Sequence, residues 1–189
     1  MPSRPPCVQG RTAHGASEIE PNSPESASHS PESTIGAHRW FSGWGIQRMV
    51  LDHAERLEDA LDLFDDHNVD FTGGPGLHYL IADGTGAKAV VEYDAGTMQV
   101  IRPPQGQPWM CLENVHMSTT SEDQRSGQWR YSTCADTLSA AAGKVSVNDA
   151  VGLLDDVRQA HTQWQCVYDL GEGTLRVIAE KSHDFTLSS

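Results

Sequence analysis

Three short apolar segments joined by two tight turns occupy the middle of the chain and restrict its fold more than any other feature. The segments are residues 77–83, 87–93 and 97–102, and each is rich in β-branched or aromatic side chains. Gly84-Thr85-Gly86 and Asp94-Ala95-Gly96 separate them and supply glycines where hairpin turns need a positive φ. The stretch therefore predicts an antiparallel meander of three strands, around which the rest of the chain packs.

Apolar residues at helical spacing precede the meander in two sets, which are separated near Glu55-Arg56. The sets are Ile46, Met49 and Val50, and then Leu57, Ala60, Leu61 and Phe64. This pattern predicts two short helices rather than one long helix. Asn68 follows the second set and is a candidate for the left-handed residue that ends a helix.

The region after the meander begins with a loop at residues 103–108, which are mainly proline, glycine and glutamine. Residues 109–115 are apolar enough to predict a strand. Residues 118–127 are polar, show no hydrophobic period and predict another loop. A helix is expected over about residues 128–142, with Gly143 as its C-terminal stop.

A further helix and a hairpin complete the chain. Ser146 is expected to cap the helix, with Asp149 near the positive end of its dipole. Residues 163–170 and 174–181 predict two strands joined by Gly171-Glu172-Gly173. Because strands and helices come in separate runs, the sequence predicts an α+β fold with antiparallel sheets and helices on their faces.

The first part of the chain has a different composition. Residues 16–34 are dominated by serine, proline and glutamate, and Ile19 is their only large apolar residue. Such a segment buries too little apolar surface to offset the entropy of ordering it. We therefore predict a disordered tail over residues 1–38 and a folded domain over residues 39–189.

Charge and cysteine content exclude several classes of partner. The net charge of −13 argues against binding to nucleic acid or to an anionic membrane surface. No apolar run reaches the roughly 18 residues that a membrane span needs, and no signal sequence follows Met1, so a cytoplasmic protein is expected. The cysteines show no paired spacing and favour reduced thiols; they are Cys7, Cys111, Cys134 and Cys166.

We expect neither a metal nor a cofactor. None of the nine histidines lies in an HxxxH, HxH or HExxH pattern. The glycines at residues 73–76 are not followed by the GK[ST] of a phosphate-binding loop, and no GxSxG elbow of a serine hydrolase is present.

Two polar residues are candidates for catalysis. Asn114 ends the predicted strand at residues 109–115, where its amide could donate a hydrogen bond to a developing oxyanion. Arg130 starts a predicted helix between Trp129 and Tyr131, where a guanidinium could clamp a carboxylate. Both residue types are also common at such places in proteins without catalytic activity, so the residues alone leave both roles open.

From about Trp44 the chain resembles the C-terminal half of the linear amide C–N hydrolases. This family comprises choloylglycine hydrolases, penicillin acylases and acyl-coenzyme A:6-aminopenicillanate acyltransferase-like proteins. The matching stretches, in family order, are residues 44–52, 68–75, 78–86, 89–92, 129–131 and 162–170. Residues 40–187 are covered, and the segment before Trp40 resembles nothing in the family.

The resemblance implies an N-terminal-nucleophile fold, a sandwich of two antiparallel sheets between two helix layers. An N-terminal cysteine attacks the amide carbonyl in this family, and its own α-amine serves as the base. Asn114 matches the asparagine of a Thr-Asn pair that donates to the oxyanion, although Glu113 replaces the threonine and places an acid beside it. Arg130 matches an arginine that supports the catalytic cysteine and aspartate. Cys166 lies where the family often has a small polar residue, so a structural role is expected for it.

The family's nucleophile is the part that this sequence does not match. Cys7 is the only candidate, and Val8-Gln9-Gly10-Arg11 after it does not resemble a hydrophobic strand. A nucleophile needs placement to within about 0.5 Å, which a Ser/Pro-rich tail does not give. We therefore expect no nucleophile in this chain, a sandwich with incomplete sheets, and self-association or pairing with a missing N-terminal half.

Two functions follow from this comparison. The first is an amide hydrolase or N-acyltransferase whose chain here is truncated and inactive alone, holding Asn114 and Arg130 while the nucleophile is encoded elsewhere. The second is a catalytically inactive remnant that binds a partner or a small acyl ligand. The acyl group and the amine are not specified by the sequence.

Overall fold

The structure is a computed structural model that describes residues 7–10, 40–74, 76–179 and 182–186. Its helices are α1 (Gly43–His53), α2 (Leu57–Asp65), α3 (Glu122–Ser126), α4 (Trp129–Ala140) and α5 (Val147–Asp156). Its strands are β1 (Cys7–Gly10), β2 (Trp40–Ser42), β3 (Asn68–Asp70), β4 (Tyr79–Ala82), β5 (Lys88–Asp94), β6 (Thr97–Ile101), β7 (Gln165–Asp169), β8 (Thr174–Ile178) and β9 (Ser182–Thr186). In these parts of the chain, no helix combines the length and apolarity needed to cross a membrane.

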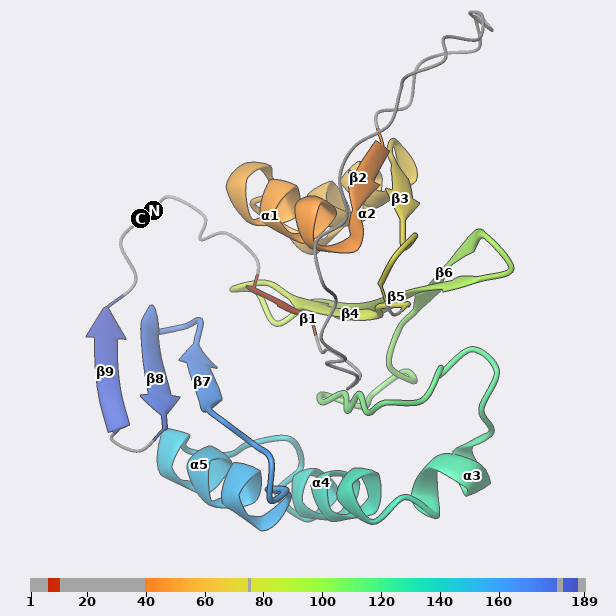
Figure 1. Cartoon of the computed structure of the whole chain (residues 1–189). Coiled ribbons are helices and arrows are strands. Elements are labelled where there is room, and N and C mark those ends of the chain that lie inside the picture. Colours follow the sequence, from red (N-terminus) through yellow and green to blue (C-terminus); the bar gives the residue numbers. More distant parts are fainter. Residues whose placement is uncertain (1–6, 11–39, 75, 180–181, 187–189) are drawn as a thin grey trace, which may run out of the picture.

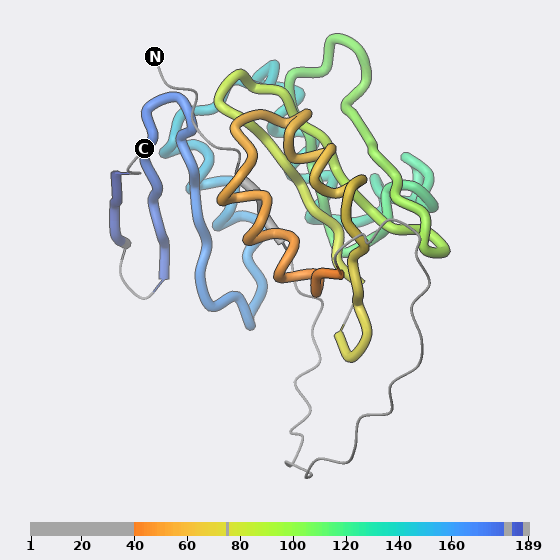
Figure 2. The backbone as a smooth tube through the Cα atoms, turned by 90° about the horizontal axis from the view of Figure 1, so that it is seen from above, coloured from red at the N-terminus to blue at the C-terminus, as the bar shows by residue number. Residues whose placement is uncertain are grey.

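Two antiparallel sheets and one short parallel pair contain these strands. The first sheet has the order β1-β4-β5-β6, the second sheet has the order β7-β8-β9, and β2 pairs with β3 in parallel. Helices α1 and α2 lie above the first sheet and α3, α4 and α5 lie below it (Figure 1). Seen from above, the second sheet lies to the side of the first (Figure 2).

The buried core lies between the first sheet and the two helices above it. Alternate residues of β4 and β5 point to this side and are fully buried, namely Tyr79, Ile81, Ala89 and Val91. They pack against the apolar faces of α1 and α2, which supply Ile46, Val50, Leu57, Ala60, Leu61 and Phe64. Every second residue of β4 and β5 therefore packs against the residues of α1 and α2 that recur at helical spacing.

Two polar contacts fix the helices on this sheet. Tyr79 donates its hydroxyl hydrogen to the carbonyl of Gly43 at 2.8 Å. A Cβ added to Gly43 would lie 2.9 Å from the Leu77 side chain, so the close approach requires glycine. Asp83 is 4% exposed and accepts hydrogen bonds from the backbone N–H groups of Leu57, at the start of α2, and Thr85, in the β4–β5 turn.

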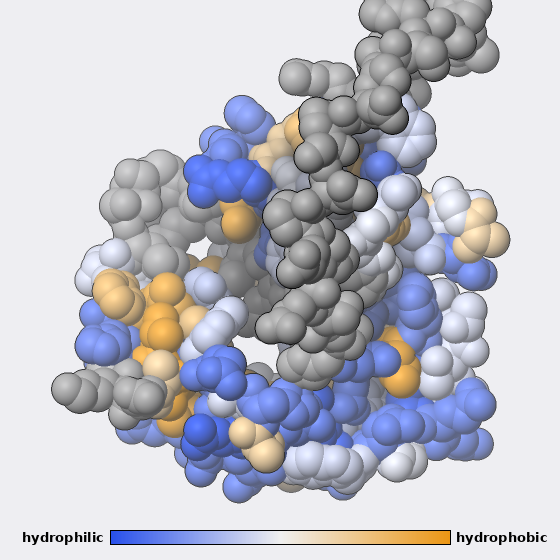
Figure 3. Space-filling view, in the orientation of Figure 1, coloured by the Kyte–Doolittle hydropathy of each residue, from blue (hydrophilic) through white to orange (hydrophobic). Residues whose placement is uncertain are grey.

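The part of the chain below the first sheet is less buried. After Arg102, Tyr131 and Val157 are the buried hydrophobic residues of the described chain. All described residues of β7 and β8 keep some exposure. Hydrophobic residues gather at the surface over the second sheet, at the lower left of Figure 3.

Most elements expected from the sequence are present. The two short helices separate near Glu55-Arg56, and the meander corresponds to β4, β5 and β6. The helix after residue 128 is α4, and Ser146 caps α5 through a reciprocal contact with Asp149. The final hairpin is β7–β8. The α+β class, with antiparallel sheets and helices on their outer sides, is confirmed.

Three local predictions after residue 66 are wrong. Residues 109–115 form no strand, because no neighbouring strand pairs with them in the described chain. Residues 118–127 contain α3, which Ser121 and Gln124 stabilise through a capping box. Asn68 does not end a helix; α2 ends at Asp65 and Asn68 begins β3, where it pairs with Trp40.

The expectation for the N-terminal segment is also corrected at one place. Residues 7–10 form β1, which pairs with β4 in the register Cys7↔Ala82 to Gly10↔Tyr79. These four residues become a strand because the edge of β4 offers unpaired backbone groups. The other residues of the predicted tail, 1–6 and 11–38, lie outside the described residues.

The two tyrosines of the meander allow a matched test of the core. Tyr79→Phe removes the hydrogen bond to Gly43 and should lower the free energy of unfolding by about 1–1.5 kcal/mol. The hydroxyl of Tyr93 is buried with no partner in the described chain, so Tyr93→Phe should be neutral or stabilising. Urea denaturation at pH 7 measures both; an equal loss in the two variants would contradict the assignment.

Candidate functional site

Asn114 lies in the irregular segment between β6 and α3. Its side chain is exposed, and within the described residues its amide has no hydrogen-bond partner. The backbone next to it is tightly turned, since the N–H of Val115 donates to the carbonyl of Glu113 at 2.7 Å. The amide is thus available to a ligand, in a segment that has no strand or helix of its own to hold it.

Glu92 of β5 points below the first sheet and binds the backbone of this segment. It is fully buried and accepts hydrogen bonds from the backbone N–H groups of Met117 (2.8 Å) and Ser118 (3.0 Å). The Ser118 hydroxyl donates to the same carboxylate at 2.9 Å, and Nδ1 of His78 lies 3.3 Å from it. Nδ1 of His116, half-exposed, lies 3.7 Å from Glu92.

These contacts determine the ionisation of Glu92. Burial alone would raise the pKa of a carboxyl group, but the hydrogen bonds from His78, Met117 and Ser118 outweigh it and lower the pKa of Glu92 to about 2. The carboxylate is therefore charged at every physiological pH. A buried charge of this kind is stable only while its donors remain in place.

Arg130 reaches the residue next to Asn114. Its Nη1 donates to Glu113 at 3.1 Å, and the two side chains are 12% and 13% exposed. Its Nε donates to the carbonyl of Val157 at 3.1 Å, and Nη1 also lies 3.4 Å from the Gln159 side chain. The acid that departs from the family pattern is therefore neutralised by the second candidate residue.

The structure thus brings Arg130 to the Asn114 segment through Glu113. One oxygen of Glu113 (Oε2) is buried and has no hydrogen-bond partner among the described residues. The charge of Glu113 is balanced, but its hydrogen-bonding capacity is not filled. This leaves an acceptor beside Asn114.

Two of the thiols whose side chains are described, Cys111 and Cys166, are not activated for nucleophilic attack. A hydrogen bond between the thiols of Cys111 and Cys134, together with burial, raises the pKa of Cys111 far above its ordinary value. Burial also raises the pKa of Cys166. A nucleophilic cysteine needs the opposite, a lowered pKa or an adjacent base.

The backbone of Cys7 lies at the other end of β4 from His78. Its register partner is Ala82, four residues from His78 along the chain, which corresponds to about 13 Å of strand. Glu92 faces His78, so the contacts that hold the Asn114 segment are at the far end of β4 from Cys7. In the described part of the chain, no group of three potential ligands could hold a metal ion.

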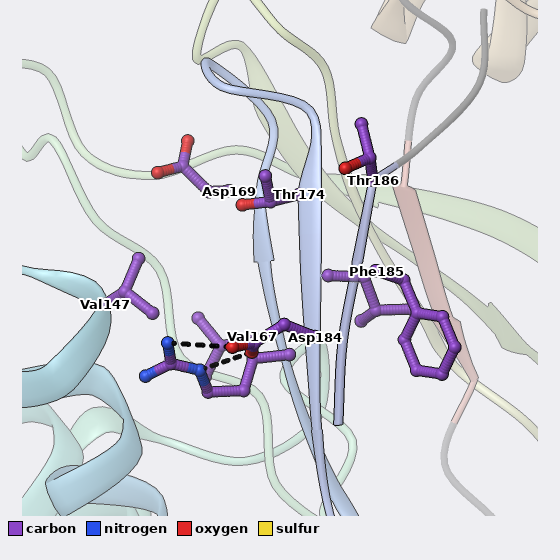
Figure 4. A pocket seen from close by; sticks show the side chains of 9 residues that line it. Val147, Val167, Asp169, Thr174, Asp184, Phe185 and Thr186 are labelled. Carbon is purple, nitrogen blue, oxygen red and sulfur yellow. Dashed lines mark hydrogen bonds and ion pairs between the residues drawn. The ribbon is translucent and has the colours of Figure 1, made fainter. Parts of the chain in front are cut away.

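A cavity of about 280 Å³ lies elsewhere, between the second sheet and the start of α5 (Figure 4). Apolar side chains line much of it, including Val147, Val167 and Phe185. Arg176 points into it and is already paired with Asp184 at 2.7 Å. Neither Asn114 nor Arg130 lines this cavity.

The sequence patterns above do not single out Glu92, His78 and Ser118 as site residues. One signal was present: Glu92 is a charged residue inside the apolar run 89–93, and the hairpin register places it opposite His78. A charged residue on a strand between apolar neighbours needs a buried partner. Its other partners, Met117 and Ser118, lie 25 and 26 residues away in sequence, and no local pattern indicates them.

Helices on the outer sides of antiparallel sheets are a fold class that this chain shares with solved structures. Two solved structures of variants of the conjugated bile acid hydrolase from Clostridium perfringens are similar to the chain. The first has a TM-score of 0.60 at 14% identity and is matched over 96% of this chain and 70% of its own. The second has a TM-score of 0.56 at 14% identity, with 84% and 66% covered. Identity this low shows the fold alone.

The sequence assigns the family within this class. The model of the acyl-coenzyme A:6-aminopenicillanic acid acyl-transferase family matches residues 28–187. The chain belongs to this family. A search of curated proteins gives no match.

The pairing of Arg130 with Glu113 can be tested by stability. Arg130→Met leaves a largely buried carboxylate without its cation and should lower the free energy of unfolding by about 2–4 kcal/mol. Adding Glu113→Gln should recover at least half of that loss. As a control, Arg48→Met breaks the exposed Arg48–Asp52 pair and should have no measurable effect. No recovery in the double variant would refute the pairing.

The lowered pKa of Glu92 predicts a loss of stability in acid. The pKa of Glu92 in the folded chain, about 2, lies below the ordinary 4.5. The ionised Glu92 therefore stabilises the fold by on the order of 3 kcal/mol, and this stabilisation is complete above about pH 4.5. It is lost as the pH falls from about 4.5 to about 2. Urea midpoints of the wild type and Glu92→Gln should therefore converge over this range, and a constant difference would contradict the assignment.

Proposed function

We propose that this chain takes part in the hydrolysis of linear amides, or in the transfer of their acyl groups to another amine. Asn114 is the oxyanion donor, and Arg130 is a positioning residue that neutralises Glu113 beside it. The observation that carries the proposal is the Asn114 amide, which is exposed and has no partner within the described residues. Its segment is held on one side by the Glu113–Arg130 ion pair and on the other by a hydrogen bond from Met117 to the buried Glu92 carboxylate. Membership of the acyltransferase family supports the reaction class.

The reaction follows from these roles. A thiolate attacks the amide carbonyl carbon, a C–S bond forms, and the carbonyl π electrons move to oxygen. The Asn114 N–H donates to this oxyanion, and in comparable sites such a contact raises kcat by a factor of about 10²–10³. The oxyanion then collapses, the C–N bond breaks, and the amine leaves with the proton that the thiol gave up to its base. Water or a second amine then takes the acyl group as the C–S bond breaks, and its proton returns to the sulfur.

The attacking thiol in this proposal is not Cys7, Cys111 or Cys166, and Cys134 is occupied by its hydrogen bond with Cys111. The raised pKa values of Cys111 and Cys166 argue against those two. The register of β1 argues against Cys7, because it places Cys7 opposite Ala82, at the end of β4 far from the contacts that hold the Asn114 segment. The thiol is supplied by another polypeptide or segment, and the open edges of the two sheets are where such a partner, or a second copy of this chain, would pair.

The same evidence against these thiols as nucleophiles favours a second function. A chain without an activated nucleophile can bind an acyl ligand at Asn114 and release it unchanged. Binding without turnover, under all conditions tested, is the signature of this alternative. It differs from the first proposal in that no thiol attacks the bound ligand.

Amine release from acyl-amide substrates tests the proposal. The 189-residue chain alone should release no amine from glycine-conjugated steroid acids or phenylacetyl amides. Protein expressed from the genomic DNA that surrounds this reading frame should release it, and Asn114→Ala should lower its kcat by about 10²–10³ with KM little changed.

Two results would change this assignment. Turnover by the chain alone that Cys7→Ala abolishes would make Cys7 the nucleophile and overturn the external thiol. Ligand binding, measured by calorimetry, without turnover in either preparation would establish the binding module instead.

A further inference from the structure

Glu92 points to the side of the first sheet opposite α1 and α2. Its strand neighbours Ala89 and Val91 belong to the core above the sheet, whereas Glu92 and Val90 alternate with them and face below. Glu92 is 0% exposed. A charged residue at this position is unnecessary for the core above the sheet and needs another explanation.

The carboxylate of Glu92 is saturated by donors from two parts of the chain. Each of its oxygens accepts a backbone N–H from the turn at residues 117–120, and the Ser118 hydroxyl and the His78 ring complete the set. An ionised carboxylate has about four acceptor sites. Two of the four donors are main-chain groups, so Glu92 recognises the backbone of the turn itself.

Arg125 of α3 holds the same turn from its other side. Its Nη1 donates to the carbonyls of Met117, at 3.1 Å, and Thr120. Two N–H groups of the turn are thus bound to the first sheet, and two of its carbonyl groups are bound to α3. Glu92 is the link between the turn and the sheet.

Asn114 lies between this turn and the Glu113–Arg130 contact. Two residues, Val115 and His116, separate it from Met117, and Glu113 immediately precedes it. An oxyanion donor has to be held 2.7–3.1 Å from the developing charge, with a tolerance of about 0.5 Å. An exposed segment without a strand or helix does not reach that precision unless it is anchored close to the donor on both sides.

We propose that Glu92 is a positioning residue for Asn114, acting through the backbone of Met117 and Ser118. It does not contact the substrate; it fixes the turn on the first sheet so that the Asn114 amide keeps one place. The role of the segment in catalysis rests on the function proposed above. The anchoring of the segment does not, and it is measured separately.

Hydrogen–deuterium exchange on the full chain at pH 7 tests the anchoring. In Glu92→Gln, an amide NH₂ group replaces one acceptor, and the backbone N–H groups of Met117 and Ser118 should exchange at least about tenfold faster. Amides of the β7–β8 pair should be unchanged. Asp94→Asn makes the same chemical change at the exposed end of β5 and should behave as the wild type.

A milder variant covers the case in which Glu92→Gln does not fold. Ser118→Ala removes one donor and leaves the backbone contacts, so the same two amides should exchange faster by a smaller factor. Unchanged exchange at Met117 and Ser118, or an equal increase throughout the molecule in both variants, would overturn the proposal.

The catalytic consequence is measured on the active preparation of the amine-release assay. Glu92→Gln should lower kcat about tenfold or more with KM changed less than twofold, and it should have no further effect in the Asn114→Ala background. Equal effects of Glu92→Gln in both backgrounds would show a general structural role and overturn positioning. If no preparation has turnover, the proposed function fails, while hydrogen exchange still decides whether Glu92 anchors the segment.

Discussion

The structure depends on a charge that is buried where an irregular segment meets a sheet. Glu92 is inaccessible to water, and its carboxylate is stable because backbone N–H groups of Met117 and Ser118 replace the water. The dependence is mutual, since the segment has no strand or helix of its own and gains its position from this contact. Asp83 acts in the same way at the other end of the sheet, where it accepts from the first N–H of α2.

The second constraint is the balance of charge beside Asn114. An acid beside Asn114 opposes the negative charge that the Asn114 amide is proposed to stabilise. Arg130 removes most of this conflict by placing a guanidinium 3.1 Å from Glu113, and the same side chain also binds the carbonyl of Val157. The Glu113 carboxylate beside Asn114 is therefore neutralised, because α4 carries its counter-charge.

Local patterns predicted the elements whose hydrogen bonds are local. The helices α1, α2 and α4 follow from apolar spacing, α5 from the cap at Ser146, and β4 to β6 from their glycine turns. Except at α3, whose capping box is local, the errors occurred where a partner distant in sequence decides. Residues 109–115 have the composition of a strand but no strand beside them in the described chain, whereas residues 7–10 belong to a segment expected to be disordered and pair with the edge of β4.

The sequence by itself determined the α+β class, the meander, and Asn114 and Arg130 as candidate residues, because each depends on spacing or on motifs within a few residues. Only the tertiary structure decided that Arg130 neutralises Glu113 and that Glu92 holds the turn after Asn114. The contacts join residues 17 and 25 positions apart. Pairing at such separations depends on how the elements pack, and a buried charge reveals its partners only once the chain has folded around it.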